Sequence, residues 1–319
     1  MILGIDIGGT KIAYGLADSS GELRGRGRRA TECSGDPETD LARIASGARA
    51  VLAEAGIPAS ELVRVGVAVP GPLDAERRRV IDPPNLPGWE TVPVAERLAR
   101  EFGCPVSLEN DANAGALAEH RFGAGQGVSD LVYLSMSTGV GGGLILGGRL
   151  HRGRSGNAGE LGHTPVEWPG DICSCGLTGC LEAYIGGAAL ARRMREHAPQ
   201  DSRVMGLAGA RERLSAVHLV EAARAGDAWA LAEMDRFNGY LSQAIVHLAF
   251  ALAPEVIVLG TIAAAAGEAL CFAPVRARVA ESTWPHQAPG MKILPAALGD
   301  ELAEYAGVCV GLEAEEAGA

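Results

Sequence analysis

The sequence predicts an α/β fold built from two related halves, and three observations lead to this prediction. Apolar runs of strand length alternate with longer runs in which apolar residues recur with helical spacing. A glycine-rich strand-turn-strand pattern opens the chain and recurs near 131–148. The chain has 319 residues, of which 47% are hydrophobic and 21% charged, so it is long enough for two globular domains.

The elements of the first half are expected in the order three strands, helix, strand, helix, strand, helix. Glycine-containing turns separate the three opening strands. Gly56 is a candidate C′ residue of the first helix, and Asn110 or Asp111 is a candidate N-cap of the last. The expected ranges are strands at 1–8, 11–18, 22–30, 63–71 and 104–110, and helices at 40–56, 94–103 and 111–123.

The second half ends in two segments of different character. The apolar passage at 244–260 contains His247, Pro254 and Glu255 near its middle. It therefore predicts a buried helix, a proline break and a buried strand rather than a membrane span. The last residues, 311–319, are acidic and small, and we expect them to form a frayed end.

The charge pattern argues against a nucleic-acid-binding surface. The net charge is −11, and basic residues gather only in the short runs at 24–29 and 193–196. A protein that binds nucleic acid through its phosphates needs a larger basic patch. We expect these arginines to lie on solvated faces.

Three of the seven cysteines, Cys173, Cys175 and Cys180, lie close together and follow His163. Disulfides, a redox pair, a metal site and incidental buried thiols are the possible explanations. The other cysteines are scattered singly and no apolar leader precedes the first strand, so a reduced, cytoplasmic compartment is expected. There, clustered cysteines beside a histidine favour a structural zinc site over bridges, although the spacing is not a pair of CxxC knuckles and buried thiols stay an alternative. Zinc with four protein ligands has no place for a bound water, so it would shape a loop.

The two glycine turns can each bind an anion. Gly8 and Gly9 let the backbone approach a ligand closely, and Thr10 and Lys11 add donors. The turn at 137–139, with Ser137, Thr138 and Gly139, offers the same kind of donors. Either turn alone is most often only a hairpin turn, and neither is a Walker A or GxGxxG motif. If the two turns face each other across a cleft, phosphates would be held between hairpins.

Six motifs together resemble the ROK family of sugar kinases and repressors, and most of all its bacterial glucokinases. The resemblance implies two actin-like, ribonuclease-H-like α/β domains that close on a central cleft. The expected domains are an N-terminal one at 1–110, completed by a C-terminal helix at about 300–319, and a larger one at 111–299 that carries the zinc-binding loop. The motifs are DIGGTK at 6–11, VPGPLD at 69–74, PPNLPGW at 83–89, LENDANAGALAE at 108–119, STGVGGG at 137–143 and GELGH with CSCGLTGCLE at 159–182.

The resemblance also implies a site for a hexose. Asp111 corresponds to the catalytic base that takes the proton from the sugar hydroxyl as it attacks the γ-phosphate of ATP. His163 would have two duties, with one ring nitrogen on zinc and the other toward the sugar. The sugar contacts implied by the family are Gly71, through the backbone near it, and Asn85, Asn110, Asp111, Glu160, His163 and Glu182.

The resemblance implies ATP as the phosphoryl donor. Asp6 would hold the Mg²⁺ that accompanies ATP, and the turns at Gly8, Gly9, Thr10 and Lys11 and at Thr138 and Gly139 would hold phosphates. Gly260 is the expected contact on the adenosine side. The family usually shows a double glycine there, whereas this chain reads Gly260-Thr261-Ile262, which places the adenosine contacts in question.

Three functions are compatible with these residues. The first is a glucokinase that phosphorylates the 6-hydroxyl of glucose, and the second is a kinase of N-acetylmannosamine or another hexose. The third is a sugar-responsive repressor or sensor, but such repressors carry a winged helix-turn-helix ahead of the sugar domain, and here the first strand begins at Ile2. An enzyme is therefore expected, with no nucleic-acid or membrane partner, and the family makes a homodimer or homotetramer the best expectation.

Overall fold

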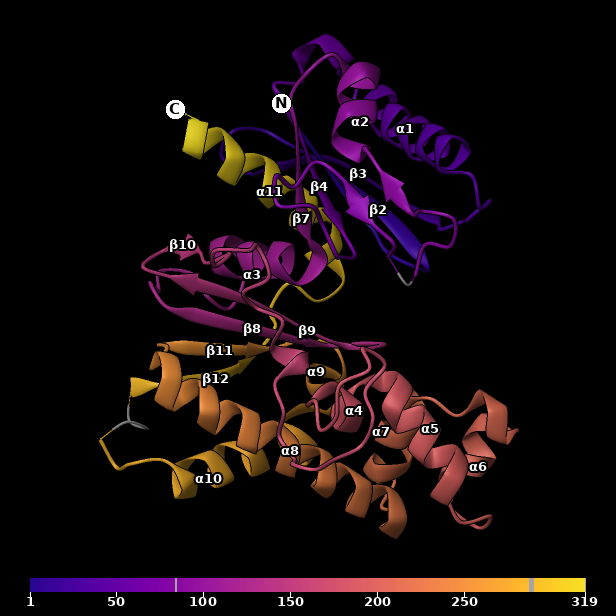
Figure 1. Ribbon diagram of the computed structural model, residues 1–319, viewed down its shortest axis with the longest axis vertical. Helices are drawn as coiled ribbons and strands as arrows, with labels where there is room; N and C mark the ends of the chain where they lie inside the picture. Colours follow the sequence, from indigo (N-terminus) through magenta and orange to yellow (C-terminus); the bar gives the residue numbers. More distant parts are fainter. Residues whose placement is uncertain (84, 287–289, 319) are drawn as a thin grey trace. The chain divides into compact units, whose positions relative to one another are not determined.

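A computed structural model describes residues 1–83, 85–286 and 290–318 of the chain (Figure 1). The motif expected at 83–89 contains Pro84, the larger expected domain contains 287–289, and the expected C-terminal helix contains Ala319. At these positions the predictions lie outside the described residues. The described chain forms two compact units, each with its own sheet and hydrophobic core.

The first unit comprises Met1–Phe122, Arg152–Gly156 and Leu298–Ala319. Its sheet has the strand order β3-β2-β1-β4-β7, in which β1 pairs antiparallel with β2 and parallel with β4. The strands are β1 (Ile2–Ile7), β2 (Lys11–Ala17), β3 (Leu23–Ala30), β4 (Arg64–Val69) and β7 (Val106–Asn110). A separate two-stranded ladder joins β5 (Val80–Ile81) to β6 (Thr91–Val92).

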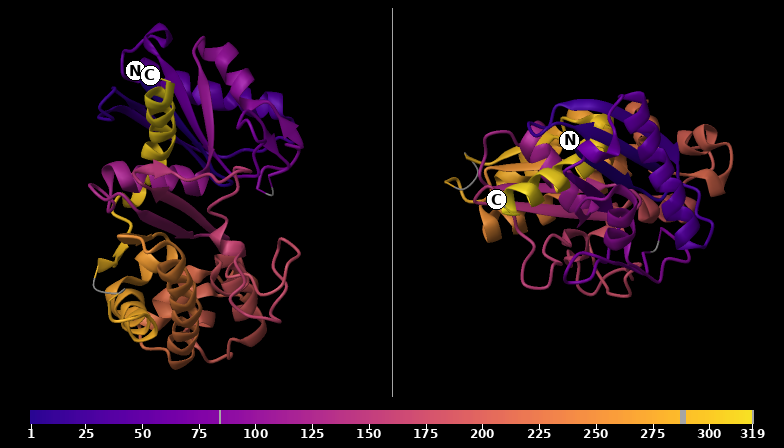
Figure 2. Two further views of the ribbon diagram at one scale, coloured as in Figure 1. Left: turned by 60° about the vertical axis from the view of Figure 1, so that its left-hand side comes forward. Right: turned by 90° about the horizontal axis from the view of Figure 1, so that it is seen from above.

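Alternate residues of β1 face different helices, as the two-residue period of a strand requires. Leu3, Ile5 and Ile7 belong to the core that includes α1 (Pro37–Glu54) and α2 (Val94–Phe102). Ile2 instead packs against α11 (Leu302–Gly318). Figure 2 shows α11, in yellow, beside the first strands in both of its views.

Glycines on β1 and β4 allow α11 to cross the sheet closely. A Cβ added at Gly4 would lie 2.2 Å from the Val308 nitrogen, and one added at Gly66 would lie 2.1 Å from the Gly307 carbonyl oxygen. Any larger residue at Gly4 or Gly66 would therefore separate the helix from the sheet. The helix α3 (Asp111–Phe122) also packs against α11.

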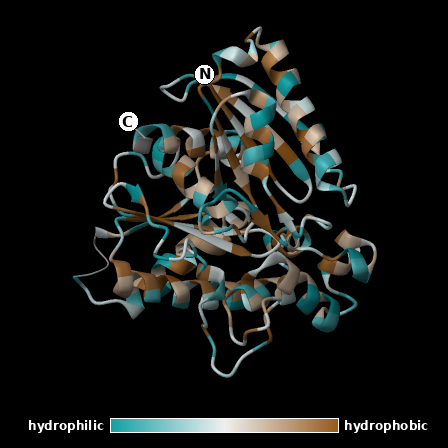
Figure 3. Cartoon of the chain, turned by 45° about the horizontal axis from the view of Figure 1, so that its top comes forward, coloured by the Kyte–Doolittle hydropathy of each residue, from teal (hydrophilic) through white to brown (hydrophobic). Residues whose placement is uncertain are grey.

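The second unit comprises Gly123–His151 and Asn157–Ala297. Its sheet has the order β10-β9-β8-β11-β12, which repeats the pairing pattern of the first sheet and confirms the predicted related halves. The strands are β8 (Leu131–Met136), β9 (Val140–Leu146), β10 (Arg149–Leu150), β11 (Val256–Leu259) and β12 (Lys292–Pro295). Hydrophobic residues concentrate on the strands of both units (Figure 3).

The helices of the second unit lie on one side of its sheet (Figure 1), and the longest, α8, spans Ala228–Leu252. It ends before Ala253, which has a φ of 44°, and β11 begins shortly after Pro254. This confirms the predicted helix, proline break and strand. The other helices are α4 (Glu182–Ile185), α5 (Gly187–His197), α6 (Arg203–Ala208), α7 (Ala216–Arg224), α9 (Ile262–Gly267) and α10 (Ala273–Ser282).

One predicted segment differs from the structure: the end at 311–319, expected to be frayed, is helical as far as 318, within the C-terminal helix that the family resemblance implied at about 300–319. The α11 helix continues to Gly318. Arg152 pairs with Glu313 and Arg121 pairs with Glu316, so side chains distant in sequence hold the last turns. The charge pattern of 311–319 could not reveal these partners.

Two smaller predictions are confirmed. Gly56 follows the last turn of α1 with a φ of 68°, as expected of a C′ glycine. Arg24, Arg26 and Arg28 of the basic run lie on the solvated side of β3 and pair with carboxylates. Among the described residues, no helix has both the length and the apolar character that crossing a membrane requires.

Candidate active site

The predicted catalytic carboxylate lies where β7 meets α3. Asn110 ends the strand and Asp111 begins the helix. The N–H groups of Ala112 and Asn113 donate to Asn110 Oδ1 at 2.9 Å and 3.4 Å, so Asn110 caps the helix. Asp111 Oδ1 accepts from the adjacent Ala112 N–H at 2.9 Å.

Two carboxylates of the first unit influence each other. Burial, followed by the charge of Asp111, raises the pKa of Asp6 to about 7, and the charge of Lys11 opposes this shift. Asp111 is exposed to solvent on one side. Desolvation by the protein around its carboxyl nevertheless raises its pKa. Two acidic groups in a poorly solvated place favour a proton or a cation between them.

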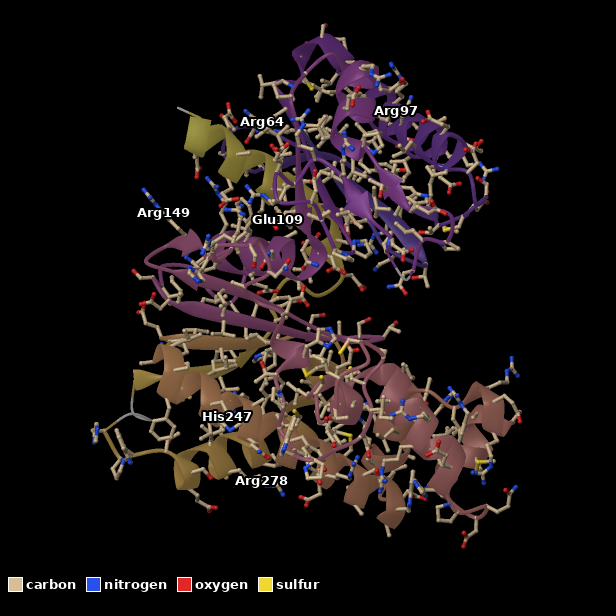
Figure 4. All side chains as sticks on the ribbon, viewed as in Figure 1. Arg64, Arg97, Glu109, Arg149, His247 and Arg278 are labelled. Carbon is tan, nitrogen blue, oxygen red and sulfur yellow. The ribbon has the colours of Figure 1, made fainter. Side chains whose placement is uncertain are left out.

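A buried glutamate, which the sequence analysis did not single out, holds the turn that carries Asp111. Glu109 is 2% exposed and lies at the end of β7 beside α3 (Figure 4). Its Oε1 accepts from the Asn110 N–H at 3.0 Å and from Asn113 Nδ2 at 3.1 Å. Its Oε2 accepts from Arg152 Nε at 2.6 Å. The buried charge is therefore paired and hydrogen-bonded, as burial of a charge requires.

The first glycine turn links β1 to β2. The Gly8 N–H donates to the Lys11 carbonyl at 2.9 Å, and the Thr31 hydroxyl donates to the Gly8 carbonyl at 2.6 Å. A Cβ added at Gly9 would lie 3.0 Å from Asn85 Cβ, so the turn touches the loop that carries a predicted sugar contact. Lys11 is exposed at the start of β2.

Gly71 and Asn110, two further predicted sugar contacts, also lie side by side. A Cβ at Gly71 would come within 3.2 Å of Asn110 Nδ2. Asn110 Oδ1 is used in capping α3, but Asn110 Nδ2 is a donor on the side of Gly71. The first unit therefore places Gly71 next to Asn110, and Asn85 next to the glycine turn.

In the second unit, the four predicted metal ligands form one cluster. The ligand atoms of His163, Cys173, Cys175 and Cys180 all lie within 4.8 Å of one another. Cys175 Sγ and Cys180 Sγ are 3.8 Å apart, and Cys173 Sγ is 3.7 Å from His163 Nδ1. These sulfurs are too far apart for a disulfide, whose S–S bond is about 2.05 Å.

Two distances within the cluster match tetrahedral zinc. Zinc bonds of about 2.3 Å to sulfur and about 2.05 Å to nitrogen place two sulfurs about 3.8 Å apart and a sulfur and a nitrogen about 3.6 Å apart. The observed 3.8 Å and 3.7 Å agree with these values. Burial and the neighbouring thiol of Cys175 raise the pKa of Cys180 to about 12, so a cation is needed to make that thiol a thiolate.

The same loop brings the three predicted sugar contacts of this unit together. His163 Nδ1 faces the cysteines, and its Nε2 lies 4.0 Å from Glu160 Oε2. Glu182 Oε1 accepts from the Ser174 hydroxyl at 2.7 Å, and Glu182 Oε2 accepts from the Val140 N–H at 2.9 Å. The cysteine cluster, the histidine and both glutamates thus form one connected group.

The second glycine turn, with Thr138 and Gly139, joins β8 to β9. The N–H groups of Gly187 and Ala188 donate to the Ser137 and Thr138 carbonyls at 2.8 Å and 2.9 Å, which places the first turn of α5 against the turn. A Cβ at Gly139 would lie 2.3 Å from Glu182 Oε2, so the turn also touches Glu182, a predicted sugar contact.

A cavity of about 670 Å³ opens beside this turn, within the second unit. Its lining includes residues that the sequence analysis missed, contributed by the start of α7 and by α9. Ser215 caps α7 in a capping box with His218, which stands where the usual sequence signature has Glu or Gln. The lining includes Thr138, Gly187, Ser215, Val217, Thr261 and Ile262.

Thr261 occupies a position where the backbone favours glycine. Its φ is 46° and its ψ is −109°, and its hydroxyl donates to the Met136 carbonyl. Thr261 lines the cavity, whereas Gly260, the predicted contact, lies against the Tyr133 hydroxyl and is absent from the lining. A direct role of Gly260 stays a prediction.

Comparison with known proteins relates the chain to one family over nearly all of its length. The ROK family profile matches residues 2–305. A glucokinase of Thermotoga maritima is 38% identical over 286 residues, which cover 89% of this chain and 88% of the relative. A ROK hexokinase structure from Thermus thermophilus superposes with a TM-score of 0.84 at 34% identity, covering 99% of each chain. A ROK family glucokinase from Streptomyces griseus, solved in complex with glucose and AMPPNP, gives a TM-score of 0.82 at 32% identity, covering 97% of this chain and 98% of the other.

Proposed function

Because this chain belongs to the ROK family, we propose that it is an ATP-dependent glucokinase that phosphorylates the 6-hydroxyl of glucose. The observation that carries the proposal is the position of Asp111, at the start of α3 and electrostatically coupled to Asp6. Phosphoryl transfer needs a base at the attacking hydroxyl and a carboxylate for the cation that neutralises the phosphates.

Asp111 acts as the general base. It accepts the proton of the sugar 6-hydroxyl as that oxygen bonds to the γ-phosphorus and the bond to ADP breaks. Glu109 and Asn110 hold the turn, so the carboxylate needs no rearrangement during the reaction. The raised pKa of Asp111 makes it a stronger base than a solvated aspartate.

Asp6 holds the cation. Mg²⁺, bound with ATP, would neutralise charge on the phosphates. A carboxylate with a pKa near 7 loses its proton readily when such a cation arrives. The residues at the two glycine turns, Gly8 to Lys11 and Thr138 with Gly139, then contact phosphate oxygens through backbone N–H groups and side-chain donors.

The adenosine part of ATP occupies the cavity beside the second turn. Its volume of about 670 Å³ and its lining of Val217 and Ile262 suit a flat, largely apolar base, and Ser215 and Thr261 offer hydroxyls. Thr138, in the phosphate turn, lies on the wall of the same cavity. Where the family usually has two glycines, this chain has Gly260 and Thr261, and here the adenosine contact is assigned to Thr261.

The zinc loop of the second unit would supply the further sugar contacts that the family resemblance implies. His163, Cys173, Cys175 and Cys180 would hold the ion, whose role is to fix the loop. His163 Nε2, Glu160 and Glu182 then meet the sugar hydroxyls, each of which both donates and accepts. Ser174 and Val140 fix the Glu182 carboxylate.

A kinase of N-acetylmannosamine or of another hexose is the alternative within the same chemistry, and a repressor or sensor is a weaker one. A repressor has no need of a base, whereas Asp111 is present here. We further propose that the enzyme works as a homodimer or homotetramer in the cytoplasm, where ATP and reduced thiols are both available.

Coupled ADP release with five sugars tests the proposal. Glucose, N-acetylmannosamine, N-acetylglucosamine, mannose and fructose are compared at equal concentration, and glucose should have the highest kcat/KM. Asp111→Asn should lower kcat with glucose, while the control Asp201→Asn, on an exposed turn, should not. Turnover of an acetamido sugar without turnover of glucose would overturn the assignment.

A further inference from the structure

The first unit contains a second cavity, of about 400 Å³, that no predicted substrate or nucleotide residue lines. Ile7 and Ile12 contribute one wall, Ile44 of α1 another, and Leu86 and Trp89 a third. Its size and mixed lining are those of a small-molecule site.

A buried hydroxyl in this cavity has no partner. Tyr14 lines it, is 1% exposed, and its hydroxyl makes no hydrogen bond in the described part of the chain. Burial raises the pKa of Tyr14, so the hydroxyl keeps its proton at neutral pH. Buried polar groups of native proteins nearly always have partners, so this hydroxyl indicates that a ligand supplies one.

The charges at the cavity leave one cation unpaired. Asp40 is buried, but the Ser34 N–H and the Trp89 indole N–H donate to it, at 2.9 Å and 3.1 Å. Arg43 pairs with Glu32 at 3.6 Å. Arg29 also lines the cavity, and no described carboxylate pairs with it. Arg29, an exposed side chain on the lining, is therefore available to an anionic group of a ligand.

The cavity also touches two of the proposed substrate-binding loops of the first unit. The Thr31 hydroxyl, on its wall, donates to the Gly8 carbonyl, and the Thr31 N–H donates to the Thr10 carbonyl at 3.0 Å. Leu86 and Trp89 belong to the loop that carries Asn85. A ligand here would contact the supports of the phosphate turn and of a sugar contact at once.

We infer that this cavity is a regulatory site for a small organic anion with an apolar ring or branched body. The anion binds Arg29, the body lies against Trp89, and Tyr14 gains a hydrogen-bond partner. Binding stiffens the loop of Asn85 and the turn at Gly8, which lowers the KM for the sugar. The regulatory effect rests on the proposed kinase function, whereas the binding itself does not.

Calorimetry with 3-phenylpropionate on the zinc-loaded protein tests binding without any enzymatic readout. Its uncharged isostere, 3-phenylpropanamide, is the matched ligand control. We expect saturable binding of the carboxylate, and Arg29→Gln should weaken it about tenfold to hundredfold, as loss of a charged hydrogen bond does. Arg26→Gln, on the same strand but paired with Glu301, should leave it unchanged. No saturable binding, or equal binding of the amide, would overturn the inference.

Two further readouts separate regulation from simple occupancy. Tyr14→Phe should weaken the probe while leaving the fold intact, because it removes only the unpaired hydroxyl. Glucose and 3-phenylpropionate should tighten each other's binding by the same factor, about fivefold or more, because linkage is reciprocal. Binding that glucose does not alter would contradict a regulatory role, and an inactive enzyme that still binds the probe would count against the proposed kinase alone.

Discussion

Replacing Asp6 by asparagine should make the protein more stable at high pH while abolishing its catalysis. Burial and the charge of Asp111 raise the pKa of Asp6 from its ordinary 3.8 to about 7. In the unfolded chain the group ionises near 3.8, so between these values the folded state binds the extra proton. The stability that this group contributes is therefore present below about pH 4 and lost as pH rises through 7.

The size of the effect follows from the same pKa difference. From 3.8 to about 7 is about three pKa units, and each is worth about 1.36 kcal/mol, so ionised Asp6 costs at most about 4 kcal/mol above pH 7. Asparagine cannot ionise and has nearly the same shape. The variant should gain up to about 4 kcal/mol at pH 8 and almost nothing at pH 4.

Urea unfolding of both proteins from pH 4 to 8, without nucleotide or magnesium, measures this difference. Asp18→Asn is the control of opposite sign, because hydrogen bonds from Ser20 and Arg24 hold the pKa of Asp18 below its usual range. That substitution should destabilise the protein at pH 8. Magnesium with ATP should stabilise the wild type more than Asp6→Asn. An equal gain at pH 4 and pH 8, or a loss at pH 8, would refute the reasoning.

Three further substitutions test the site. Asp111→Asn should lower kcat by roughly 10²- to 10⁴-fold with little change in glucose affinity by calorimetry, and near-normal kcat would remove Asp111 from the mechanism. Metal analysis should find about one zinc per wild-type chain and none in Cys175→Ser, whose KM for glucose should rise. A zinc-free protein with an unaltered KM would contradict the proposal that zinc fixes the sugar-binding loop. Glu109→Gln keeps an acceptor for Asn110 but breaks the pair with Arg152, so kcat should fall more than KM rises, and an unchanged kcat would make Glu109 only structural.

Local patterns in the sequence were sufficient to predict most strands and helices of the first half and the residues of the His/Cys cluster. The strands of the first half and the helix before Pro254 follow from apolar periodicity and from residues that break it. The ligands from His163 to Cys180 span few positions, so their convergence needs only one loop. The choice between Asn110 and Asp111 as the cap needed coordinates, because both have suitable side chains.

Long-range contacts account for what the sequence could not predict. The cavity of the second unit, which we propose for adenosine, combines Thr138, Ser215 and Thr261, which tertiary packing alone brings together. A C-terminal helix was expected from the family resemblance, but its pairing with arginines far away in the chain could not be predicted. Glu109 is an ordinary charged residue in the sequence, and only its burial and its hydrogen bonds reveal that it holds the turn that carries Asp111.

Identification of the product made from ATP and glucose tests the central claim most directly. The protein is incubated with magnesium, ATP and glucose, and the sugar product is assigned by phosphorus and carbon NMR. The account predicts glucose 6-phosphate and ADP in equal amounts, and far slower formation of both with Asp111→Asn. Phosphate on a different hydroxyl, ADP formed without a sugar phosphate, or undiminished product with Asp111→Asn would contradict it.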